Sequence, residues 1–366
     1  MVLAFAHRNA PLLVTGGAGF IGSCFVRRAV AAGHRVVNLD ALTYAGTKTR
    51  LPGLLDHPLH RFVHGDIRDA DLLKRLVAEV RPRAIVHFAA ESHVDRSIND
   101  ATPFIQTNVA GTGNLLAATL AYWEGLDKAE QREFRFLHIS TDEVFGSLDD
   151  DGFFTETSAY NPRSPYAASK AASDHLVRSF HLTYGLPVLL TNCSNNYGPY
   201  QFPEKLVALT TVRAITGKPL PIYGDGTNVR DWIHVEDSCA AFEAVLAKGR
   251  PGESYCIGGE AERANIDTVL TICGFLDQMA PRADGKPYAD QITFVTDRPG
   301  HDFRYATDCA KARNELGWSG SRTFETGLGD TVRWFLNNRA WWEPILAATY
   351  DGGRLGLREK TLVPAH

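Results

Sequence analysis

The sequence predicts a doubly wound α/β fold, with a parallel sheet of the Rossmann type joined to a smaller mixed α/β lobe. In the first half of the chain, short apolar runs alternate with longer segments of helical spacing. A glycine-rich segment separates the first of these runs from the first helical segment. After about residue 195 the alternation ends, and Gly and Pro interrupt the chain more often. Apolar strands that alternate with helices form parallel sheets covered on both faces.

The first half is expected to contain six strands, each a short apolar run that ends in polar or glycine residues. They are Leu12–Thr15, Arg35–Asp40, Arg61–His64, Ala84–Phe88, Phe136–Ser140 and Pro187–Asn192. The segments between them carry apolar residues at helical spacing, and the first one stops at Gly33. The expected helices are Phe20–Ala32, Asp69–Val80, Pro103–Tyr122 and Pro165–Tyr184, followed in the second half by Lys205–Thr216, Val235–Ala247, Asp267–Gln278 and Phe324–Asn337.

This pattern divides the chain into three parts. Residues 1–195 form the expected Rossmann domain, and residues 196–340 form the smaller lobe, with segments that can interleave. Residues 341–366 form a tail without a predicted function. Because no low-complexity linker separates the lobes, we expect them to form one rigid body.

Composition excludes several other classes of protein. Of the 366 residues, 44% are hydrophobic, which is enough for a full core. The 38 basic and 42 acidic side chains give a net charge of −4, which argues against nucleic-acid binding. No apolar stretch has the ~18–20 residues that a membrane span needs, and the N-terminus lacks the basic segment of a signal peptide. The six cysteines form no CxxC pair, so we expect free thiols, a cytoplasmic location and no metal site.

A glycine motif between the first strand and the first helix predicts a dinucleotide site. Thr15–Gly22 reads TGGAGFIG, and Gly16, Gly19 and Gly22 let the backbone approach a pyrophosphate at the helix N-terminus. Asp40 lies 18 residues after Gly22 and ends the next strand, where a carboxylate accepts from a ribose 2′-hydroxyl and repels a 2′-phosphate. A purely structural turn is the alternative, but this context favours NAD as the cofactor.

Two more segments follow strands at the same edge of the predicted sheet. In an open parallel sheet, ligands bind outside the carboxyl ends of the strands, so these segments are expected to line the cofactor. For Asp66, a cap or turn residue is the alternative. The segments comprise Asp66 and Ile67 after the third strand, and Ala89, Ala90, Glu91, Ser92 and His93 after the fourth.

Tyr166 and Lys170 lie four residues apart on a predicted helix and therefore share one face. A cation beside a tyrosine, together with the nicotinamide charge, stabilises the phenolate, so Tyr166 could take a proton from a hydroxyl while hydride leaves the same carbon. YxxxK alone is also common on solvated helices. The motif indicates catalysis only together with the glycine motif and a hydroxyl residue at the end of the fifth strand. Ser140 or Thr141 could be that residue and hydrogen-bond the reacting hydroxyl.

Asp142 and Glu143 come directly after those hydroxyl residues. Elimination of water needs one group to remove a C–H proton and another to protonate the leaving hydroxyl. Two neighbouring carboxylates with different pKa values can fill both roles. For this dipeptide taken alone, a polar turn after a strand is the alternative.

Together, TGGAGFIGS, YxxxK and the hydroxyl residue in register resemble the extended short-chain dehydrogenase/reductase family. The resemblance implies an active site between the nucleotide lobe and a C-terminal lobe that holds a nucleotide-diphosphate sugar. Over roughly residues 11–338, the chain is similar to the nucleotide-sugar 4,6-dehydratases of that family. The segments that carry this similarity are STDEVFG, AAESHVDRS, SPYAASK, NCSNNYGPYQFPEKL, PIYGDGTNVRDWIHVED and DRPGHDFRY.

The resemblance implies a role for each candidate catalytic residue. Tyr166 would be the base for oxidation at sugar C4, with Lys170 as its partner and as a ribose ligand. Thr141 would hold the 4-hydroxyl, Asp142 would be the acid at C6, and Glu143 would be the base at C5. The remaining cofactor ligands would be Phe20, Ile21, Ala41, Leu42, Thr43, Thr107 and Asn196.

The second lobe would hold most of the sugar nucleotide. Arg230 offers a planar fork for a diphosphate and Tyr223 a face for base stacking, although each alone is ordinary for a surface or core residue. Phe145 and Phe303 depart from the Tyr and Arg that are usual in the family. The implied substrate ligands are Ser92, His93, Thr141, Asn195, Lys205, Leu206, Pro221, Ile222, Tyr223, Arg230, Asn265, Asp297 and His301, with the segment Asp297–His301 closing over the nucleotide.

The resemblance thus implies a redox-neutral, NAD-dependent lyase that acts on dTDP-glucose in deoxysugar biosynthesis, with uracil and cytosine left open as the base. A nucleotide-sugar 4-epimerase or decarboxylase on the same scaffold is the nearest alternative. A non-catalytic dinucleotide-binding regulator is the alternative from another class. By the same resemblance, the long helices near residues 103–122 and 165–184 would pair across a two-fold axis into the four-helix bundle of a homodimer.

Overall fold

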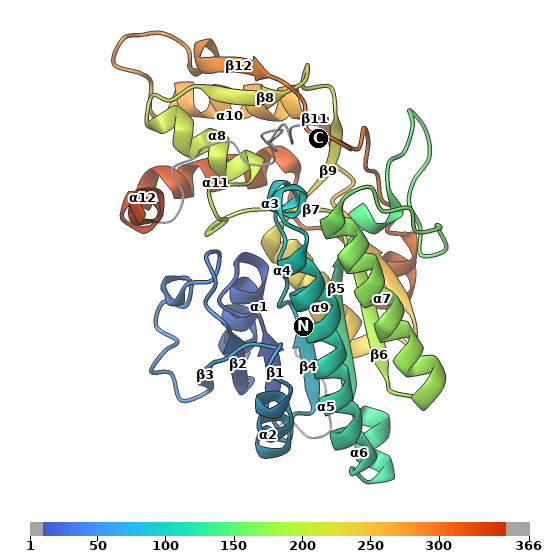
Figure 1. Cartoon of the computed structure of the whole chain (residues 1–366). Helices are drawn as coiled ribbons and strands as arrows, with labels where there is room; N and C mark the ends of the chain where they lie inside the picture. The colour runs from blue at the N-terminus through green and yellow to red at the C-terminus, as the bar shows by residue number, and fades with distance from the viewer. Residues whose placement is uncertain (1–9, 349–366) are drawn as a thin grey trace, which may run out of the picture.

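The computed structural model describes residues 10–348, which form two lobes (Figure 1). The larger lobe is built on a seven-stranded parallel sheet with the strand order β10–β6–β5–β4–β1–β2–β3. The chain runs outward from β1 through β2 to β3, and then continues in β4 on the other side of β1. At such a switch point the loops after the strands diverge and leave a crevice. The predicted doubly wound fold is confirmed.

All six strands expected in the first half are present. Their bounds are β1 (Leu12–Thr15), β2 (Val36–Asp40), β3 (His60–His64), β4 (Ala84–His87), β5 (Arg135–Thr141) and β6 (Val188–Cys193). The seventh strand, β10 (Ser254–Ile257), was not expected, because four residues are too few to show a period.

Helices cover both faces of this sheet (Figure 1). Leu12 and Val14 of β1 belong to the core beneath α1 and α9, whereas Leu13 belongs to the core beneath α2, α5 and α7. Alternate strand residues point to opposite faces, so both faces of a buried strand are apolar. The bounds are α1 (Phe20–Ala31), α2 (Ala70–Val80), α5 (Thr112–Glu124), α7 (Pro165–Tyr184) and α9 (Val235–Lys248).

The ends of α7 follow directly from its sequence. The Ser164 hydroxyl accepts a hydrogen bond from Ala167 N at 3.1 Å, and Pro165 occupies the first helical position, where its missing N–H is not needed. Gly185 ends the helix with φ +75°, a left-handed conformation that glycine adopts without steric penalty. These signals place Tyr166 in the first turn of α7.

The long helix expected at residues 103–122 is interrupted. It consists of α4 (Thr102–Phe104), a π-helical segment η2 (Ile105–Gly111) and α5. A Cβ on Gly111 would lie 2.7 Å from Ile67 Cγ1, so the glycine allows a close approach there. Within η2, the Asn108 side chain pairs with the backbone of Glu91, the segment after β4. A π-helical turn of this kind is common at functional sites.

The second lobe contains two small sheets with helices packed against them. Its core includes Tyr197, Trp232, Phe324 and Leu328. One sheet has the order β11–β9–β7 and the other pairs β12 with β8 in parallel. The bounds are β7 (Asn195–Tyr197), β8 (Leu220–Tyr223), β9 (Val229–His234), β11 (Glu262–Ala264), β12 (Ile292–Val295), α8 (Leu206–Ile215), α10 (Asn265–Met279), α11 (Phe324–Asn337) and α12 (Arg339–Ala348).

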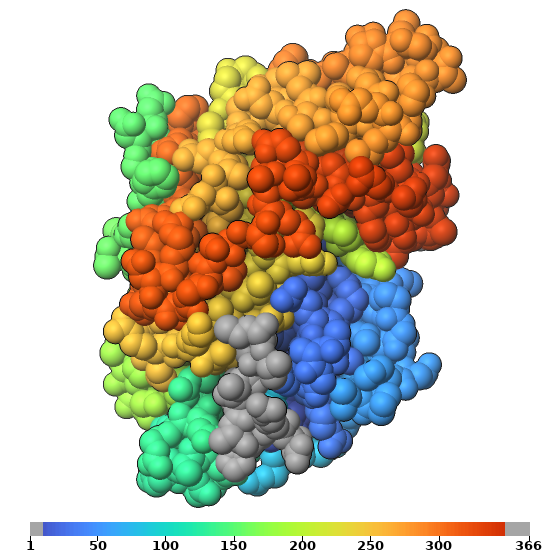
Figure 2. Space-filling model, turned by 180° about the vertical axis from the view of Figure 1, so that it is seen from behind, coloured from blue at the N-terminus to red at the C-terminus, as the bar shows by residue number. Residues whose placement is uncertain are grey.

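The two lobes are interleaved along the chain. The expected boundary after residue 195 marks where the chain first leaves the main sheet, but α9 and β10 return to it. In the view from behind, C-terminal segments in red and orange border the blue N-terminal region (Figure 2). Of the expected tail, α12 packs on α11 through the buried Trp342, whereas residues 349–366 lie outside the described residues.

Several short elements were not expected. They are η1 (Lys48–Arg50), α3 (Val94–Asn99), α6 (Lys128–Glu133), η3 (Asp142–Phe145), η4 (Tyr288–Gln291) and η5 (Ala312–Leu316). Only α6 has a clear sequence signal, since Asp127 and Glu130 form a capping box. All six cysteines are buried and unpaired, as predicted. Within residues 10–348, no helix is long and apolar enough to cross a bilayer.

Candidate active site

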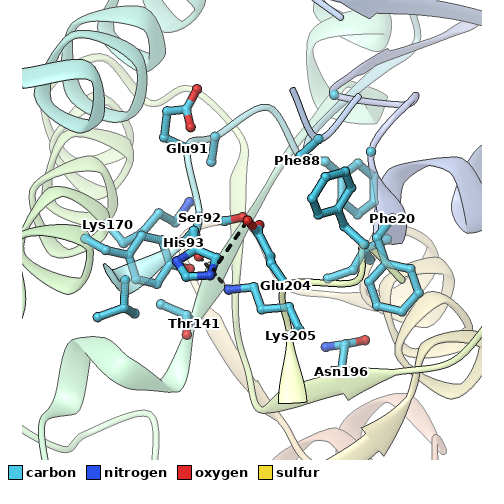
Figure 3. Close-up of a pocket in the computed structure, with 18 of the residues that line it drawn as sticks. Phe20, Phe88, Glu91, Ser92, His93, Thr141, Lys170, Asn196, Glu204 and Lys205 are labelled. Atoms are coloured by element: carbon cyan, nitrogen blue, oxygen red, sulfur yellow. Dashed lines mark hydrogen bonds and ion pairs between the residues drawn. The ribbon is translucent and has the colours of Figure 1, made fainter. Parts of the chain in front are cut away.

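A cavity of about 490 Å³ lies between the two lobes, at the carboxyl ends of the strands of the main sheet. One wall is formed by the loops after β1, β2, β4 and β5, and the other by residues of the second lobe. Figure 3 shows Ser92 and His93 on one side of it, with Glu204 and Lys205 reaching toward them. The cavity occupies the crevice that the strand order leaves at the switch point.

The glycine loop forms one end of this cavity. Gly16 has φ +75°, and a Cβ on it would lie 2.5 Å from Ala89 N, while a Cβ on Gly22 would lie 2.3 Å from Gly16 O. Both positions therefore require glycine. The N-cap of α1 is Gly19, which has no side chain to occupy the first N–H groups of the helix. A backbone cradle at a helix N-terminus fits the pyrophosphate of a dinucleotide.

Asp40, at the end of β2, lines the cavity and holds the glycine loop in place. Its carboxylate accepts hydrogen bonds from Ala18 N and from Leu42 N, each at 2.8 Å. Burial raises the pKa of Asp40, although these two hydrogen bonds act in the opposite direction. Leu42 is not among the residues that line the cavity; its backbone, with φ +51°, shapes the turn after β2, and its side chain packs against the core beneath α1 and α9. Its role as a cofactor ligand stays a prediction.

The loops after β3 and β4 complete the dinucleotide side. Asp66 lines the cavity and also acts as a turn residue, because it accepts from Arg68 N at 2.8 Å and pairs with the Arg68 guanidinium at 2.7 Å. Burial would raise the pKa of Asp66, but the hydrogen bonds and charge of Arg68 outweigh it, and the pKa is lowered. Asn108 fixes the segment after β4 by bonding both Glu91 N at 2.8 Å and Glu91 O at 2.9 Å.

The candidate catalytic residues gather at the end of β5. Thr141 is the last residue of the strand, and its Oγ1 accepts from Glu143 N and donates to Asp142 Oδ1, both at 3.3 Å. The Ser140 hydroxyl instead donates to Asp174 at 2.8 Å. Of the two hydroxyl residues left open by the sequence, Thr141 is the one whose side chain lies close enough to Tyr166 to act on its pKa.

Burial shifts the pKa of every acid in this group upward. Burial raises the pKa of Asp142 well above its ordinary value, and the neighbouring charges of Glu143 and Asp231 add to the effect. Burial also raises the pKa of Glu143, while the cations of Arg298 and Lys205 act in the opposite direction. The neighbouring negative charges favour the protonated form of Asp142, which can donate a proton, whereas the neighbouring cations favour the charged form of Glu143, which can accept one.

Tyr166 and Lys170 lie on α7 facing the cavity, as their spacing predicts. Burial and the Glu143 charge raise the pKa of Tyr166 well above its ordinary value. Lys170 Nζ donates to Ile139 O at 2.9 Å. The side chains of the polypeptide alone therefore keep Tyr166 as a phenol.

A buried network lies directly behind Lys170. Its Nζ is 3.4 Å from His138 Nε2, which in turn is 3.2 Å from Asp174 Oδ1. Burial lowers the pKa of Lys170 to about 8, and Asp174 acts in the opposite direction. Burial likewise lowers the pKa of His138 to about 4. Asp174 is held by Ser140 and Tyr160, each donating at 2.8 Å, so the ammonium group has a fixed position.

The second lobe brings cations to its side of the cavity, where their charges act to lower the pKa values of Asp142 and Glu143. Arg230 is buried, and its guanidinium donates to the carbonyls of Val229 at 2.7 Å and Asp302 at 2.9 Å. Its Cζ also lies 4.3 Å from the centre of the Tyr305 ring. Lys205 Nζ donates to Ser92 O at 2.8 Å, across the cleft between the lobes (Figure 3). Carbonyl dipoles hold both cations without neutralising their charge, as a diphosphate site requires.

Asp95 is a functional candidate that the sequence did not single out. It lies in α3 of the larger lobe and accepts from the Tyr223 hydroxyl at 2.9 Å, while pairing with Arg298 at 3.4 Å. Glu204 was also missed: it accepts from Tyr44 at 3.1 Å and lies 3.7 Å from His93 Nε2 (Figure 3). Both carboxylates link the lobes. Only tertiary contacts reveal them, because their partners are far away in the sequence.

Nearly every residue predicted to bind the cofactor or the sugar nucleotide lines this cavity. Besides Leu42, the exception is Asp297, which pairs with His301 Nδ1 at 2.7 Å and so orients a lining residue. Phe145 stacks on Phe154 in the core, and Phe303 is 40% exposed; neither lines the cavity. The predicted residues that line it are Gly16, Gly19, Phe20, Ile21, Gly22, Asp40, Ala41, Thr43, Asp66, Ile67, Ala89, Ala90, Glu91, Ser92, His93, Thr107, Thr141, Asp142, Glu143, Tyr166, Lys170, Asn195, Asn196, Lys205, Leu206, Pro221, Ile222, Tyr223, Arg230, Asn265 and His301.

The chain is similar to known nucleotide-sugar enzymes over nearly its whole length. A family model described as GDP-mannose 4,6 dehydratase matches residues 13–331. A dTDP-glucose 4,6-dehydratase of Xanthomonas campestris pv. campestris is 58% identical over 347 residues, which cover 95% of this chain and 99% of the relative. A crystal structure of a dTDP-glucose 4,6-dehydratase from Streptomyces venezuelae with NAD bound has 48% identity and a TM-score of 0.83, covering 92% of this chain and 99% of that chain.

The same architecture also occurs in enzymes with another reaction. The crystal structure of a UDP-glucose 4-epimerase from Thermus thermophilus in complex with NAD has a TM-score of 0.79 and 29% identity, and covers 90% of this chain and 99% of that chain. The overall fold therefore does not distinguish dehydration from epimerisation. The side chains at the end of β5 must do so.

Proposed function

The chain belongs to the GDP-mannose 4,6-dehydratase family, and we propose that within this family it converts dTDP-glucose to dTDP-4-dehydro-6-deoxyglucose and water. It is an NAD-dependent hydro-lyase. The observation that carries this assignment is the pair Asp142 and Glu143, which lies in the cavity wall beside Tyr166 and Lys170. An enzyme that only oxidised and reduced one carbon would need neither carboxyl group.

The proposed proton transfers follow from the surroundings of each group. Thr141 holds the sugar 4-hydroxyl while Tyr166 takes its proton, and the resulting 4-ketone acidifies the hydrogen at C5. Glu143 removes that proton, and Asp142, kept protonated by its raised pKa, donates to the C6 hydroxyl, which leaves as water. Glu143 then returns a proton to C5. Bound NAD would supply the hydride acceptor for C4 and the hydride donor for C6, and its nicotinamide charge would favour the phenolate of Tyr166.

The remaining cavity residues account for binding. The glycine loop and Asp40 would hold the pyrophosphate and one ribose of NAD, and Lys170 the other ribose. The diphosphate of the sugar nucleotide would lie against Arg230 and Lys205, whose charges no carboxylate of the described residues neutralises at hydrogen-bond distance. Such a preorganised set of donors binds a diphosphate without first breaking ion pairs.

Replacement of the two carboxyl groups tests the assignment. In Asp142→Asn and Glu143→Gln, dehydration should slow by about 10²–10⁴-fold, because each variant loses one acid–base group. Oxidation at C4 should persist, so the absorbance of reduced nicotinamide should rise after addition of dTDP-glucose. Mass spectrometry of the sugar product measures loss of water directly. Incubation with UDP- and CDP-glucose in parallel establishes which base is accepted.

Asp149→Asn is a matched control, because this carboxyl group is exposed and lies in the same loop beyond η3. It should leave dehydration unchanged. A product that keeps its C6 hydroxyl, at a rate that neither Asp142→Asn nor Glu143→Gln alters, would identify an epimerase. No turnover with any nucleotide sugar would point to a dinucleotide-binding regulator.

The assembly we propose is a homodimer through α5 and α7. The two helices lie side by side on the outside of the main sheet (Figure 1). Residues 101–123, which include most of α5, contain no charged side chain. Ile105 in η2, and Leu182 and Tyr184 at the end of α7, are large side chains that are exposed. Light scattering at micromolar concentration should give twice the chain mass, and Ala117→Asp, a charge on the exposed face of α5, should give a monomer.

The location we propose is the cytoplasm, where thiols stay reduced. This proposal is supported by the six cysteines, all of which lie within the described residues and are unpaired.

A further inference from the structure

The loop after β2 contains a buried arginine for which the proposed reaction has no use. Arg50, the last residue of η1, has no exposed surface and lines the cavity. Burial lowers the pKa of its guanidinium to about 10, which is still far above neutral pH. A full positive charge therefore lies inside the protein, and such a charge requires strong partners.

The partners of Arg50 are backbone carbonyls from three separate segments. Its Nε donates to Tyr200 O at 2.9 Å, and its Nη1 donates to Ala18 O at 3.3 Å and to Ala45 O. Ala18 lies in the glycine loop, Ala45 in the loop after β2, and Tyr200 in the segment that leads from β7 to α8. One guanidinium thus connects the two loops that would cradle the dinucleotide with the opposite lobe.

Aromatic rings from the second lobe surround this guanidinium. The Trp341 ring of α12 lies 5.2 Å from Arg50 Cζ, and the Phe202 ring lies 6.0 Å from it. Trp341 Nε1 also donates to Thr49 Oγ1 at 3.1 Å, so α12 contacts the loop after β2 directly. Figures 1 and 2 show the C-terminal helices beside the blue N-terminal region. We call Arg50, Tyr200, Phe202, Trp334 and Trp341 the Arg50 cluster.

Tyr200 shows that the cluster constrains the backbone. Its φ is +69°, a left-handed conformation that is rare for a bulky side chain. Its ring lies 4.6 Å from the Trp334 ring and 5.3 Å from the Trp341 ring, and Arg27 Cζ lies 4.7 Å from it on the side of the larger lobe. A strained residue of this kind persists only where its surroundings hold it, and such residues are frequent at ligand clamps.

Both backbone polar groups of Ala18 make hydrogen bonds. Its N–H donates to Asp40 at 2.8 Å, and its carbonyl accepts from Arg50 at 3.3 Å and from Thr47 N at 3.1 Å. Asp40 thus orients one side of the glycine loop and Arg50 the other. Without Arg50, the carbonyl would lose its charged donor, and the loop would be tied to the second lobe less firmly.

We propose that Arg50 is a positioning residue for the dinucleotide: it keeps the glycine loop, the loop after β2 and the second lobe closed together, and thereby slows the release of NAD. Trp341 contributes by packing its ring against the Arg50 guanidinium. The function of α12 would then be to hold Arg50 in position. The inference rests on NAD as the cofactor of the proposed reaction, but not on the sugar chemistry. A cycle without net redox change has no need to exchange its cofactor, so slow release agrees with it.

Arg50→Met and Trp341→Leu test this proposal. Protein loaded with NAD is diluted in the absence of sugar nucleotide, and the released NAD is measured over time after rapid filtration. Arg50→Met should release NAD about 10-fold faster than the wild type, because it loses charge-assisted hydrogen bonds. Trp341→Leu should release it about 3-fold faster, because the guanidinium stays but loses its aromatic neighbour. Arg50→Lys should lie between Arg50→Met and the wild type.

Arg83→Met is the matched control, because Arg83 is also buried but lies directly before β4, outside the residues that line the cavity. It should lower the unfolding temperature and leave NAD release unchanged. Release at the wild-type rate from Arg50→Met would overturn the proposal, as would an equal acceleration in Arg83→Met. If Arg50→Met does not fold, an unchanged rate in Trp341→Leu overturns it. Since no sugar nucleotide is present, none of these outcomes bears on the dehydration itself.

Discussion

The two ends of the cavity, its β5 side and its second-lobe side, treat buried charge in opposite ways. At the end of β5, Asp142 is 1% exposed, and its Oδ2 has no hydrogen-bond partner among residues 10–348. Burial and the charge of Glu143 raise its pKa, although the Arg230 cation acts in the opposite direction. On the second-lobe side, Arg230 is 5% exposed, and burial lowers its pKa, but the carbonyls of Val229 and Asp302 accept its hydrogen bonds and favour the charged form.

This difference separates the groups that transfer protons from the groups that bind charge. An acid must be able to change its protonation state, so it is useful for it to lack a strong partner. A cation that binds a diphosphate must stay charged, and neutral carbonyl dipoles achieve this without competing for the anion. We therefore expect changes at the first end to affect kcat and stability, and changes at the second end to affect KM.

The largest effect is expected at the end of β5. Tyr166→Phe removes only the phenol oxygen that would take the C4 proton, so kcat should fall by about 10²–10⁴-fold with little change in KM. Unlike in Asp142→Asn, the absorbance of reduced nicotinamide should not rise, because the first step is blocked. Single-turnover absorbance measurements with dTDP-glucose distinguish the two variants. A rise in Tyr166→Phe as large as in Asp142→Asn would remove Tyr166 from its proposed role.

A smaller effect, on a different constant, is expected from Arg230→Met. Loss of a charge-assisted contact to the diphosphate should raise KM for the sugar nucleotide by about 10–100-fold and lower kcat less. Arg304→Met is the control, since Arg304 is also buried, pairs with Glu262 at 2.7 Å, and does not line the cavity. It should lower stability without affecting KM. A fall in kcat alone for Arg230→Met would show that the two ends are not separate in function.

The smallest effect is a gain of stability in Lys170→Met. The pKa of Lys170 is about 8 in the fold, against an ordinary lysine value of 10.5, so the unfolded chain binds the proton more tightly. The wild type therefore loses stability as the pH falls from 10.5 to 8 and remains less stable below that. Lys170→Met removes this contribution and should raise the free energy of unfolding by about 1–3 kcal/mol at pH 7, with a smaller gain near pH 10.

Urea unfolding at pH 7 and at pH 10 checks this prediction. Lys48→Met, at an exposed lysine in η1, should have almost no effect at either pH. A destabilised Lys170→Met protein, or a gain that is equal at both pH values, would mean that burial does not strain this ammonium group.

The main sheet could be predicted because each of its first six strands is a continuous apolar run with its own boundary signals. The Leu12–Thr15 run and the glycines after it, for example, define β1 and the start of α1. The strands of the second lobe carry no comparable signal. β7 and β11 have only three residues each, and their pairing with β9 joins segments far apart in the chain.

The candidate site also contains residues that the sequence could predict and residues that it could not. Gly16, Asp40, Tyr166 and Lys170 stand in motifs whose spacing implies a shared face or a shared edge, and all four line one cavity. Arg50 belongs to no motif, and its importance depends on three carbonyls and an aromatic ring that the sequence does not place near it.

By itself, the sequence determined the doubly wound sheet, the position of the glycine loop, and a set of candidate residues that line one cavity. The physical reason is that strand alternation, helical period and turn chemistry act over a few neighbouring residues. Only the tertiary structure decided which charges lose their water and which find partners. It left Asp142 Oδ2 without a hydrogen-bond partner among residues 10–348, directed Lys170 to Ile139 O rather than to Tyr166, and joined Arg50 to α12, because desolvation and long-range hydrogen bonds depend on how distant segments pack.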